Sequence, residues 1–332
     1  MAIKIAINGF GRIGRSAFRI ALANPNIEVV AINDLTENSM LAHLLKYDTA
    51  FGKLDAEVSA DEKSIIVNGN VIPSMAIKDP AELPWADLNV DVVLECTGIF
   101  TKEEDAKKHI QAGAKKVLIS APAKGNIDLI VLGANEEKIS DQQILSNASC
   151  TTNCITPVVA VIDETIGIEK AMMTTIHSYT ADQNLQDGPH HDDFRRARAA
   201  AQNIVPTTTG AAVATTKVVP NLAGKFDGLA IRVPVVDVSL SDITMLVKKE
   251  TTIEEINSIL EKASQSDRFK GILGFTTEEL VSSDFIKNSY SSVVDGKLTQ
   301  VVAGNLVKVI AWYDNEWGYS NRLVELAEKV MQ

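Results

Sequence analysis

The sequence predicts an α/β protein with two domains, a doubly wound parallel sheet followed by an α+β domain whose sheet is mainly antiparallel. Three observations support this prediction. The chain has 332 residues, which is long for a single hydrophobic core. Up to about residue 150, short apolar strands alternate with helical segments, and beyond it the strands become longer. With 45% apolar and 23% charged residues, the composition is that of an ordinary globular protein.

The first half consists of short apolar segments separated by helix and turn signals. Strands are expected at residues 2–7, 27–34, 91–98, 115–122 and 128–135. Helices are expected at 16–25, 39–48 and 103–113. The dipeptide Asn68-Gly69 favours a tight turn between two short strands.

The second half changes its pattern. A long helix is expected over 154–167, although Pro157 should strain it. Longer strands are expected at 169–180, 228–248 and 306–314, with an amphipathic helix at 252–265. The tail, residues 320–332, has the spacing of an amphipathic helix, whose apolar stripe needs a groove.

Charge and composition exclude several functions. A net charge of −11 disfavours nucleic acid and anionic membranes as general partners. No apolar run reaches the length of a membrane span, and the start lacks the features of a signal peptide. Three cysteines do not make a disulfide framework, so a cytoplasmic location is expected. The run at 195–198, "RRAR", is either a solvated helix face or a small patch for an anion or another subunit.

Gly9, Gly11 and Gly14 form a G-x-G-x-x-G motif between the first strand and the first helix. Such glycines let the backbone approach a pyrophosphate, whose charge the helix N-terminus favours, as in Rossmann-type sheets. Arg12 and Ile13 lie in that first helical turn, where their N–H groups should face the phosphates.

Asp34 ends the second strand, twenty positions after Gly14. An acid at this place accepts hydrogen bonds from the adenosine ribose hydroxyls and repels a 2′-phosphate. NAD is therefore expected as the cofactor in preference to NADP. The alternative is a glycine-rich turn with an Asp that only caps a helix.

Cys150 follows the loop "SNAS" and opens a helix. Zinc ligation with Cys154 and His177, a disulfide, and an inert thiol such as Cys96 are the alternatives to a nucleophile. Helix N–H groups should lower the pKa of the Cys150 thiol and stabilise an oxyanion. Of the five histidines, His177 ends a strand of the second half, so it is favoured as the base.

Two further features suggest anion binding. The stretch at 206–210, "PTTTG", offers hydroxyls and a glycine amide in a turn, or is only a polar loop that caps a helix. Arg232 lies in an apolar strand, where its charge needs a substrate phosphate or an internal carboxylate as partner.

Together these segments resemble the phosphorylating glyceraldehyde-3-phosphate dehydrogenases. The resemblance rests on "INGFGRIGR" (7–15), "ASCTTNC" (148–154), "HSYT" (177–180), "PTTTGAA" (206–212), "RVP" (232–234) and "WYDNEWGYS" (312–320), in family order over essentially the whole chain. It implies that Cys150 attacks the aldehyde of glyceraldehyde 3-phosphate, with His177 as base. A hydride then passes to NAD, and inorganic phosphate releases 1,3-bisphosphoglycerate from the thioester.

The resemblance also implies roles for individual residues. Binders of the substrate's own phosphate would be Thr180, Arg196 and Arg232. The attacking phosphate would contact Ser149, Thr151, Thr209 and Gly210. NAD would contact Arg12, Ile13, Asp34, Lys78, Ser120 and Asn315, with Asn315 on the nicotinamide carboxamide and Tyr319 near the ring. No metal is implied.

The family likeness further implies an NAD-binding domain over 1–149 and a catalytic domain over 150–316. The C-terminal helix, about 317–332, would pack back onto the first of these. Residues 178–204 resemble a loop that reaches a neighbouring subunit, which implies a homotetramer. Two departures stand out: Val213 where the family usually has Lys, with Lys217 four residues on, and Gly188 where an apolar residue is frequent, which leaves Asp34 and Pro189 to set the cofactor preference.

Two other functions remain open from the sequence. An erythrose-4-phosphate dehydrogenase would share the cysteine–histidine pair and the fold. A non-catalytic binding protein on the same scaffold would belong to a different class, although intact Cys150, His177 and Arg232 weigh against it.

Overall fold

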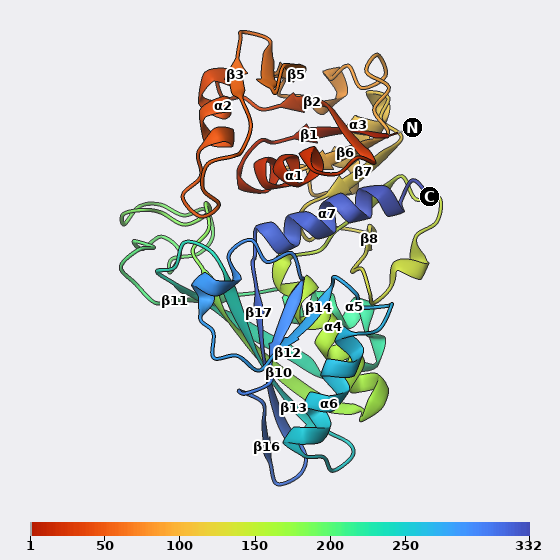
Figure 1. The fold of residues 1–332 in the computed structure, drawn as a ribbon, viewed down its shortest axis with the longest axis vertical. Helices are drawn as coiled ribbons and strands as arrows, with labels where there is room; N and C mark the ends of the chain where they lie inside the picture. Colours follow the sequence, from red (N-terminus) through yellow and green to blue (C-terminus); the bar gives the residue numbers. More distant parts are fainter. Residues whose placement is uncertain (1) are drawn as a thin grey trace. The chain divides into compact units, whose positions relative to one another are not determined.

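The computed structural model describes residues 2–332 and contains two compact units. The first unit comprises residues 2–130, 136–148 and 320–332, and the second comprises 131–135 and 149–319. Each unit is built around one large β-sheet (Figure 1). Among the described residues, no helix combines the length and apolar character needed to cross a membrane.

The sheet of the first unit has nine strands in the order β3-β4-β5-β2-β1-β6-β7-β9-β8. They are β1 (Ile3–Asn8), β2 (Ile27–Asn33), β3 (Val58–Ala60), β4 (Ser64–Val67), β5 (Asn70–Met75), β6 (Val92–Glu95), β7 (Lys116–Ile119), β8 (Asp128–Leu129) and β9 (Ile144–Ser146). All pairings from β5 to β8 are parallel, and β3, β4 and β5 pair antiparallel. The predicted doubly wound parallel sheet is confirmed.

The order of this sheet reverses at β1, which pairs with β2 on one side and with β6 on the other. Helices α1 (Arg12–Leu22), α2 (Asn38–Lys46) and α3 (Glu103–Gln111) connect the strands, with short 3₁₀ turns η1 (Pro80–Glu82) and η2 (Glu136–Lys138). Ligands of such sheets bind beyond the carboxyl ends of the strands at the reversal point. Residues that follow β1, β2 and β6 are therefore placed for ligand binding.

The second unit has a mainly antiparallel sheet, as predicted, in the order β11-β12-β10-β13-β17-β15-β14 with β16 paired to β17. Its strands are β10 (Ile168–Ser178), β11 (Val205–Thr208), β12 (Phe226–Val233), β13 (Ser239–Val247), β14 (Leu273–Thr276), β15 (Ser292–Asp295), β16 (Gln300–Val302) and β17 (Leu306–Tyr313). Only the β10–β12 and β14–β15 pairs are parallel.

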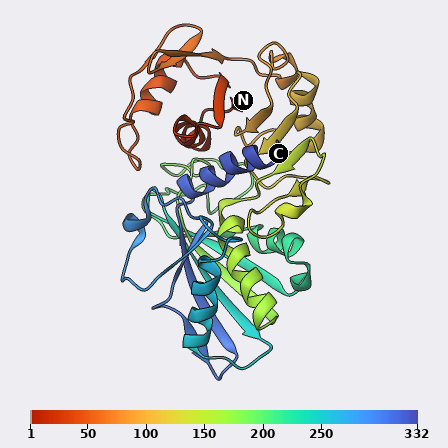
Figure 2. The same cartoon turned by 45° about the vertical axis from the view of Figure 1, so that its right-hand side comes forward.

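Helices cover one face of this second sheet. They are α4 (Cys150–Thr165), α5 (Ala211–Val218) and α6 (Ile253–Ser264), with 3₁₀ turns η3 (Pro220–Leu222) and η4 (Ser282–Phe285). Figure 2 shows α4 and α6 lying side by side over the strands. The other face leaves Met172 and Leu229 exposed. The last helix, α7 (Trp317–Lys329), begins in the second unit, and its residues from Ser320 onward belong to the first.

Three segments differ from the sequence-based prediction. The strand expected at 128–135 is only β8, because the Asn135 side chain accepts the N–H of Val131 at 2.8 Å and closes a turn. The strand expected at 228–248 is broken after β12, where Val238 has a φ of +69°. Helix α4, by contrast, runs through Pro157 as the sequence led us to expect. The short strand β9 was not predicted.

Candidate active site

Cys150 is the first residue of α4, in the second unit. Ser149 caps this helix, since its Oγ accepts the N–H of Thr152 at 3.0 Å. The helix therefore begins where the sequence places it, and the thiol lies beside the first backbone N–H groups. Cys154 lies one turn further into α4 and is buried against Ser292 and Ala311, so it is a packing residue.

Cys150 and His177 are brought together. The Cys150 Sγ lies 3.5 Å from His177 Nε2. The other ring nitrogen, Nδ1, donates to the backbone carbonyl of Ser178 at 2.7 Å. Because Nδ1 carries the proton, Nε2 presents its lone pair to the thiol. The ring also packs edge-on against Tyr313, at 5.9 Å between centroids, so its orientation is fixed.

Burial controls the protonation of this pair. Burial, together with the charge of Arg232, lowers the pKa of His177 to about 3. Burial raises the pKa of the Cys150 thiol, while Arg232 and the hydroxyl and amide of Thr151 act in the opposite direction. The expectation that helix N–H groups leave this thiol with a lowered pKa is therefore wrong: desolvation is the larger effect. At rest the pair is a neutral thiol beside a neutral imidazole.

Arg232 stands beside the pair because of strand register. In the parallel β10–β12 pairing, Arg232 is directly opposite His177. Its Nη1 donates to Thr180 Oγ1 at 2.8 Å and to the Ser178 carbonyl at 3.2 Å. Arg232 therefore supplies a nearly buried positive charge next to the thiol and the imidazole.

Arg196 and Thr180 share a carboxylate, that of Asp182. Arg196 Nη1 lies 2.7 Å from Asp182 Oδ2, and the Thr180 hydroxyl donates to Asp182 Oδ1. The nearby charges of Arg232 and Arg196 contribute to holding the pKa of Asp182 below its ordinary value, against burial. Asp182 thus occupies the place of an anion among the predicted phosphate binders. Sequence reasoning missed it, although an acid two residues after "HSYT" was a visible signal.

Of the four residues predicted for the second phosphate, three lie at helix starts and the hydroxyl of the fourth is turned away. Ser149 and Thr209 lie at helix starts, and Gly210 caps α5. The Thr151 hydroxyl, however, is turned inward to the Tyr313 hydroxyl at 3.0 Å. Only the backbone N–H of Thr151, at the start of α4, remains suited to an anion.

Asn315 is fixed by two serines. Its Oδ1 accepts from Ser178 Oγ at 3.0 Å and from Ser239 Oγ at 2.7 Å. Ser239 Oγ accepts the N–H of Ser178 and gives its own proton to Asn315. The amide orientation is thereby determined, with Nδ2 as the donor on the opposite side. Tyr319 lies in α7 and is 5% exposed.

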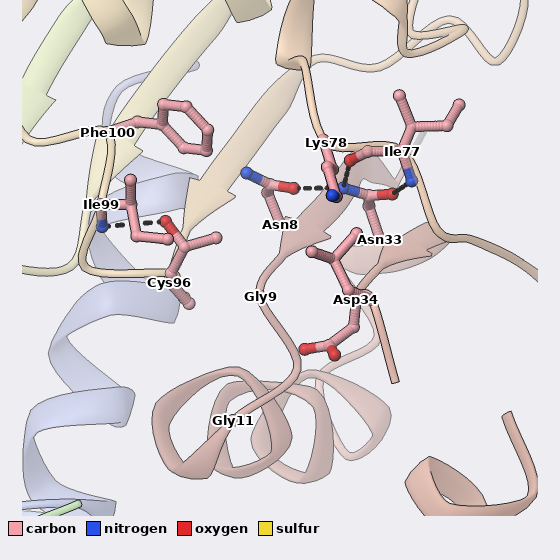
Figure 3. A pocket seen from close by; sticks show the side chains of 12 residues that line it. Asn8, Gly9, Gly11, Asn33, Asp34, Ile77, Lys78, Cys96, Ile99 and Phe100 are labelled. Atoms are coloured by element: carbon pink, nitrogen blue, oxygen red, sulfur yellow. Dashed lines mark hydrogen bonds between the residues drawn. The ribbon is translucent and has the colours of Figure 1, made fainter. Parts of the chain in front are cut away.

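A separate pocket lies in the first unit, at the carboxyl ends of β1, β2 and β6. It has a volume of about 480 Å³ and is lined by Asn8, Gly9, Gly11, Asn33, Asp34, Leu35, Ile77, Lys78, Cys96, Thr97, Ile99 and Phe100 (Figure 3). Gly9, Gly11, Asp34 and Lys78 were predicted from the sequence. The other residues were missed, although Asn8 and Asn33 are the last residues of β1 and β2 and Cys96 directly follows β6.

The glycines form a tight cradle. Gly9 has a φ of +91°, and a Cβ there would lie 2.6 Å from Thr97 N. A Cβ on Gly14 would lie 2.1 Å from the Gly9 carbonyl. Both positions need glycine so that the turn can pack closely, which fits a pyrophosphate held by backbone amides.

Asp34 points toward this glycine turn (Figure 3). Its Oδ2 accepts the N–H of Phe10 at 2.7 Å, and its Oδ1 accepts that of Thr36 at 3.0 Å. Each oxygen has a lone pair left for a hydroxyl. Two other predicted residues lie outside the pocket lining: Arg12 pairs with Asp48, and Ser120 donates its backbone N–H to Glu95 at 2.9 Å. Ile13 lies in the first turn of α1.

The group His190, His191 and Asp192 has ligand atoms within 4.8 Å of one another, alone among residues 2–332 in this respect. His190 Nδ1, however, already accepts the N–H of Asp193 at 3.0 Å. His191 and Asp192 are exposed, and exposed groups of this kind are common without an ion, so we assign no metal to this loop.

A dinucleotide cradle together with a cysteine beside a histidine defines the class of nicotinamide-dependent dehydrogenases that oxidise aldehydes through the thiol. Residues 3–103 match the model of the glyceraldehyde 3-phosphate dehydrogenase NAD binding domain, and residues 149–315 match the model of the C-terminal domain. The chain belongs to the glyceraldehyde-3-phosphate dehydrogenase family. NAD is its cofactor.

Similar proteins extend over the whole chain. A glyceraldehyde-3-phosphate dehydrogenase of Priestia megaterium (strain DSM 319 / IMG 1521) is 55% identical over 332 residues, covering 99% of this chain and 98% of the relative. Glyceraldehyde-3-phosphate dehydrogenase 1 of Bacillus subtilis (strain 168) is 55% identical over 329 residues, covering 98% of each chain. That of Geobacillus stearothermophilus is 54% identical over the same length and share.

The Asp34 carboxylate should set the preference for NAD over NADP. Asp34→Ser removes a negative charge from the pocket, so the ratio of kcat/KM for NAD to that for NADP should fall by roughly tenfold or more. Asp61→Ser, which also removes a turn carboxylate but lies outside the pocket, is the matched control. An unchanged ratio in Asp34→Ser would rule out this role.

The charge of Arg232 should promote ionisation of Cys150. Arg232→Ala should slow alkylation of Cys150 by iodoacetamide at about pH 8 by roughly tenfold, because fewer thiolates form. Peptide mapping measures the rate, and Arg195→Ala, which removes an exposed arginine, should leave it unchanged. Equal or faster alkylation in folded Arg232→Ala would contradict the electrostatic role.

Proposed function

We propose that the chain oxidises D-glyceraldehyde 3-phosphate with NAD and inorganic phosphate to 1,3-bisphosphoglycerate. The observation that carries this proposal is the 3.5 Å approach of Cys150 Sγ to His177 Nε2, with Arg232 in register beside it. The names of the relatives favour this triose phosphate over erythrose 4-phosphate, and an intact pair favours catalysis over a purely binding role.

In the first step, Cys150 Sγ forms a bond to the aldehyde carbon. The thiol proton passes to His177 Nε2, which returns it to the carbonyl oxygen, so the product is a hemithioacetal. Helix N–H groups at the start of α4 favour the negative charge on that oxygen. The neutral imidazole with its lone pair on Nε2 is the form needed for this transfer.

In the second step, His177 Nε2 takes the hydroxyl proton while a hydride leaves the carbon, which gives a thioester on Cys150. NAD, when bound, supplies the hydride acceptor. We propose that Asn315 Nδ2 holds the nicotinamide carboxamide and that Tyr319 packs near the ring. The bonds from Ser178 and Ser239 support this assignment, because they fix the Asn315 amide.

In the third step, a phosphate oxygen attacks the thioester carbonyl and the carbon–sulfur bond breaks. Cys150 leaves as a thiolate and regains its proton from His177, and the proton of the phosphate goes to solvent. We propose Ser149, the Thr151 amide, Thr209 and Gly210 for the attacking phosphate. Helix starts at α4 and α5 support them.

The phosphate of the substrate is assigned to Arg232, Arg196 and Thr180. Their support is the Asp182 carboxylate, which already pairs with Arg196 and Thr180. A substrate phosphate would take over these contacts in exchange for Asp182.

For the cofactor we propose contacts with Gly9, Gly11, Gly14, Arg12, Ile13, Asp34, Lys78 and Ser120. The pocket of the first unit supports Gly9, Gly11, Asp34 and Lys78, which line it. We further propose an NAD-binding domain over 1–149 that includes the C-terminal helix, and a catalytic domain over 150–316.

A cytoplasmic homotetramer completes the proposal. Cys96, Cys150 and Cys154 are free thiols, as in a reducing compartment. Leu185 and Phe194, in the loop after β10, are 81% and 96% exposed, and Met172 and Leu229 are exposed on the open sheet face. Apolar side chains exposed in this number support contacts with other subunits.

Omitting phosphate should reveal the thioester. Without phosphate, NADH formation from glyceraldehyde 3-phosphate should stop after about one equivalent per Cys150, since nothing discharges the acyl group. Cys150→Ser should form no NADH but still bind NAD, and His177→Asn should slow acylation by about 10²–10⁴-fold. Cys154→Ala is the control that keeps turnover. Sustained turnover without phosphate, or faster turnover on erythrose 4-phosphate, would contradict the proposal.

Light scattering should give the mass of four chains. Leu229→Asp places a charge on the open sheet face and should shift the protein to smaller species, because the charge would be buried between subunits. Val71→Asp, at an exposed apolar position of the first unit, should leave the mass unchanged. A monomeric native protein would rule out the tetramer.

A further inference from the structure

Two carboxyl groups with no part in the steps above are buried together in the second unit. Asp237 lies in the connection between β12 and β13, and Asp314 directly follows β17. Each is 1% exposed, and their side chains lie next to each other. The antiparallel register places Ser239 opposite Tyr313, so both acids lie at the same end of the β13–β17 pair.

The two acids have very different hydrogen-bond partners. Asp314 Oδ1 accepts the amides of Glu316 at 3.0 Å and Trp317 at 2.6 Å, and its Oδ2 accepts that of Lys287 at 2.8 Å. Three amide donors favour the carboxylate form of Asp314. Among the described residues, neither carboxyl oxygen of Asp237 has a hydrogen bond of ordinary geometry. The side chain lies beside the Asp314 carboxyl and the Val238 amide.

Two carboxyl groups in contact need a proton between them, because ionised oxygens only accept. Because Asp314 accepts three amides and Asp237 accepts none of ordinary geometry, the proton belongs to Asp237, which then donates to Asp314. Burial, with the charges of Asp314 and Glu316, raises the pKa of Asp237 to about 9. Burial raises the pKa of Asp314 to about 6, against the amides that it accepts. The pair therefore holds one proton around neutral pH.

This pair closes a strained turn. Val238, between Asp237 and Ser239, has a φ of +69°, which is rare for a β-branched residue and strains the backbone. Asp237, which precedes Val238, contacts Asp314. Ser239, which follows Val238, donates to Asn315 at 2.7 Å. Two adjacent side-chain contacts thus join the turn to residues 314–315, and the strain persists because both contacts hold it.

We infer that Asp237 is a positioning residue for the cofactor: the proton that it shares with Asp314 holds residues 237–239 against residues 314–316 and so fixes the Asn315 amide. This inference rests on the proposed function, in which Asn315 holds the nicotinamide carboxamide. Asp237 itself touches neither substrate nor cofactor.

The inference has a definite pH dependence. The charged group that acts on the pair is Glu316. Lys287 contacts Asp314 only through its backbone amide, and its ammonium lies 5.9 Å from the Trp317 ring. The pKa of Asp237 is about 9 in the folded protein and about 3.9 in an unfolded chain. The stability that this proton contributes is therefore complete below about pH 4 and is lost as pH rises through about 9. Above that value two charges repel across the turn.

The test compares NAD binding by calorimetry from about pH 7 to about pH 10, without substrate. In the native protein the dissociation constant should rise at the alkaline end, by up to about tenfold per pH unit. In Asp237→Asn, whose amide donates to Asp314 at every pH, this rise should be lost while affinity at neutral pH is kept. The control is Asp242→Asn, which removes a carboxylate on β13 that pairs with Lys308. This variant should behave as the native protein.

A second measurement does not need NAD, and its main readout is on the native protein. Infrared spectra of the native protein should show the carbonyl band of a buried protonated carboxyl at neutral pH, which disappears near pH 9 and is absent in Asp237→Asn. An equal alkaline loss of affinity in native protein and Asp237→Asn, or no such band, overturns the inference. If native protein binds no NAD at any pH, the proposed function fails, and the band still decides whether the shared proton exists.

Discussion

The second unit depends on the backbone and hydroxyl of one residue, Ser178. Its carbonyl accepts from His177 Nδ1 and from Arg232, and its hydroxyl donates to Asn315. A single peptide unit at the end of β10 therefore orients the base, the buried cation and the amide assigned to the nicotinamide. Because the hydrogen bond to the carbonyl fixes the imidazole tautomer, displacement of this peptide would disturb proton transfer and cofactor binding together.

The magnitudes explain why burial outweighs the helix at Cys150. A helix terminus favours a charge by about 0.3–1 kcal/mol at exposed sites and up to about 2 when partly buried. Desolvation shifts a buried group by as much as about 3–5 pKa units, each worth about 1.4 kcal/mol. The thiol therefore stays protonated at rest, and the charge is formed when Arg232, the amides and the imidazole act on it together.

Much of this could be predicted from the sequence, because the signals were local. The glycine turn, the cap before Cys150 and the strand that ends at His177 each follow from neighbouring residues. The prediction of a strand over 128–135 was wrong because the Asn135 side chain closes a turn within a segment of apolar residues. Ser178 and Ser239 act on the site through Arg232 and Asn315, which lie far along the chain, so the sequence did not reveal them. The inward turn of the Thr151 hydroxyl likewise depends on Tyr313, 162 positions away.

Asp182 gives the proposed substrate-phosphate site a counter-ion of its own. Asp182 pairs with Arg196 and accepts from Thr180, so the charge of Arg196 is already neutralised by a carboxylate of the chain. An arriving phosphate would exchange one anion for another, so the local charge would change little between the empty and loaded states. Such an exchange limits how tightly product is retained, since its departure restores an internal ion pair instead of exposing a lone guanidinium. The internal carboxylate thus lowers the affinity for the phosphate group and favours release of the product.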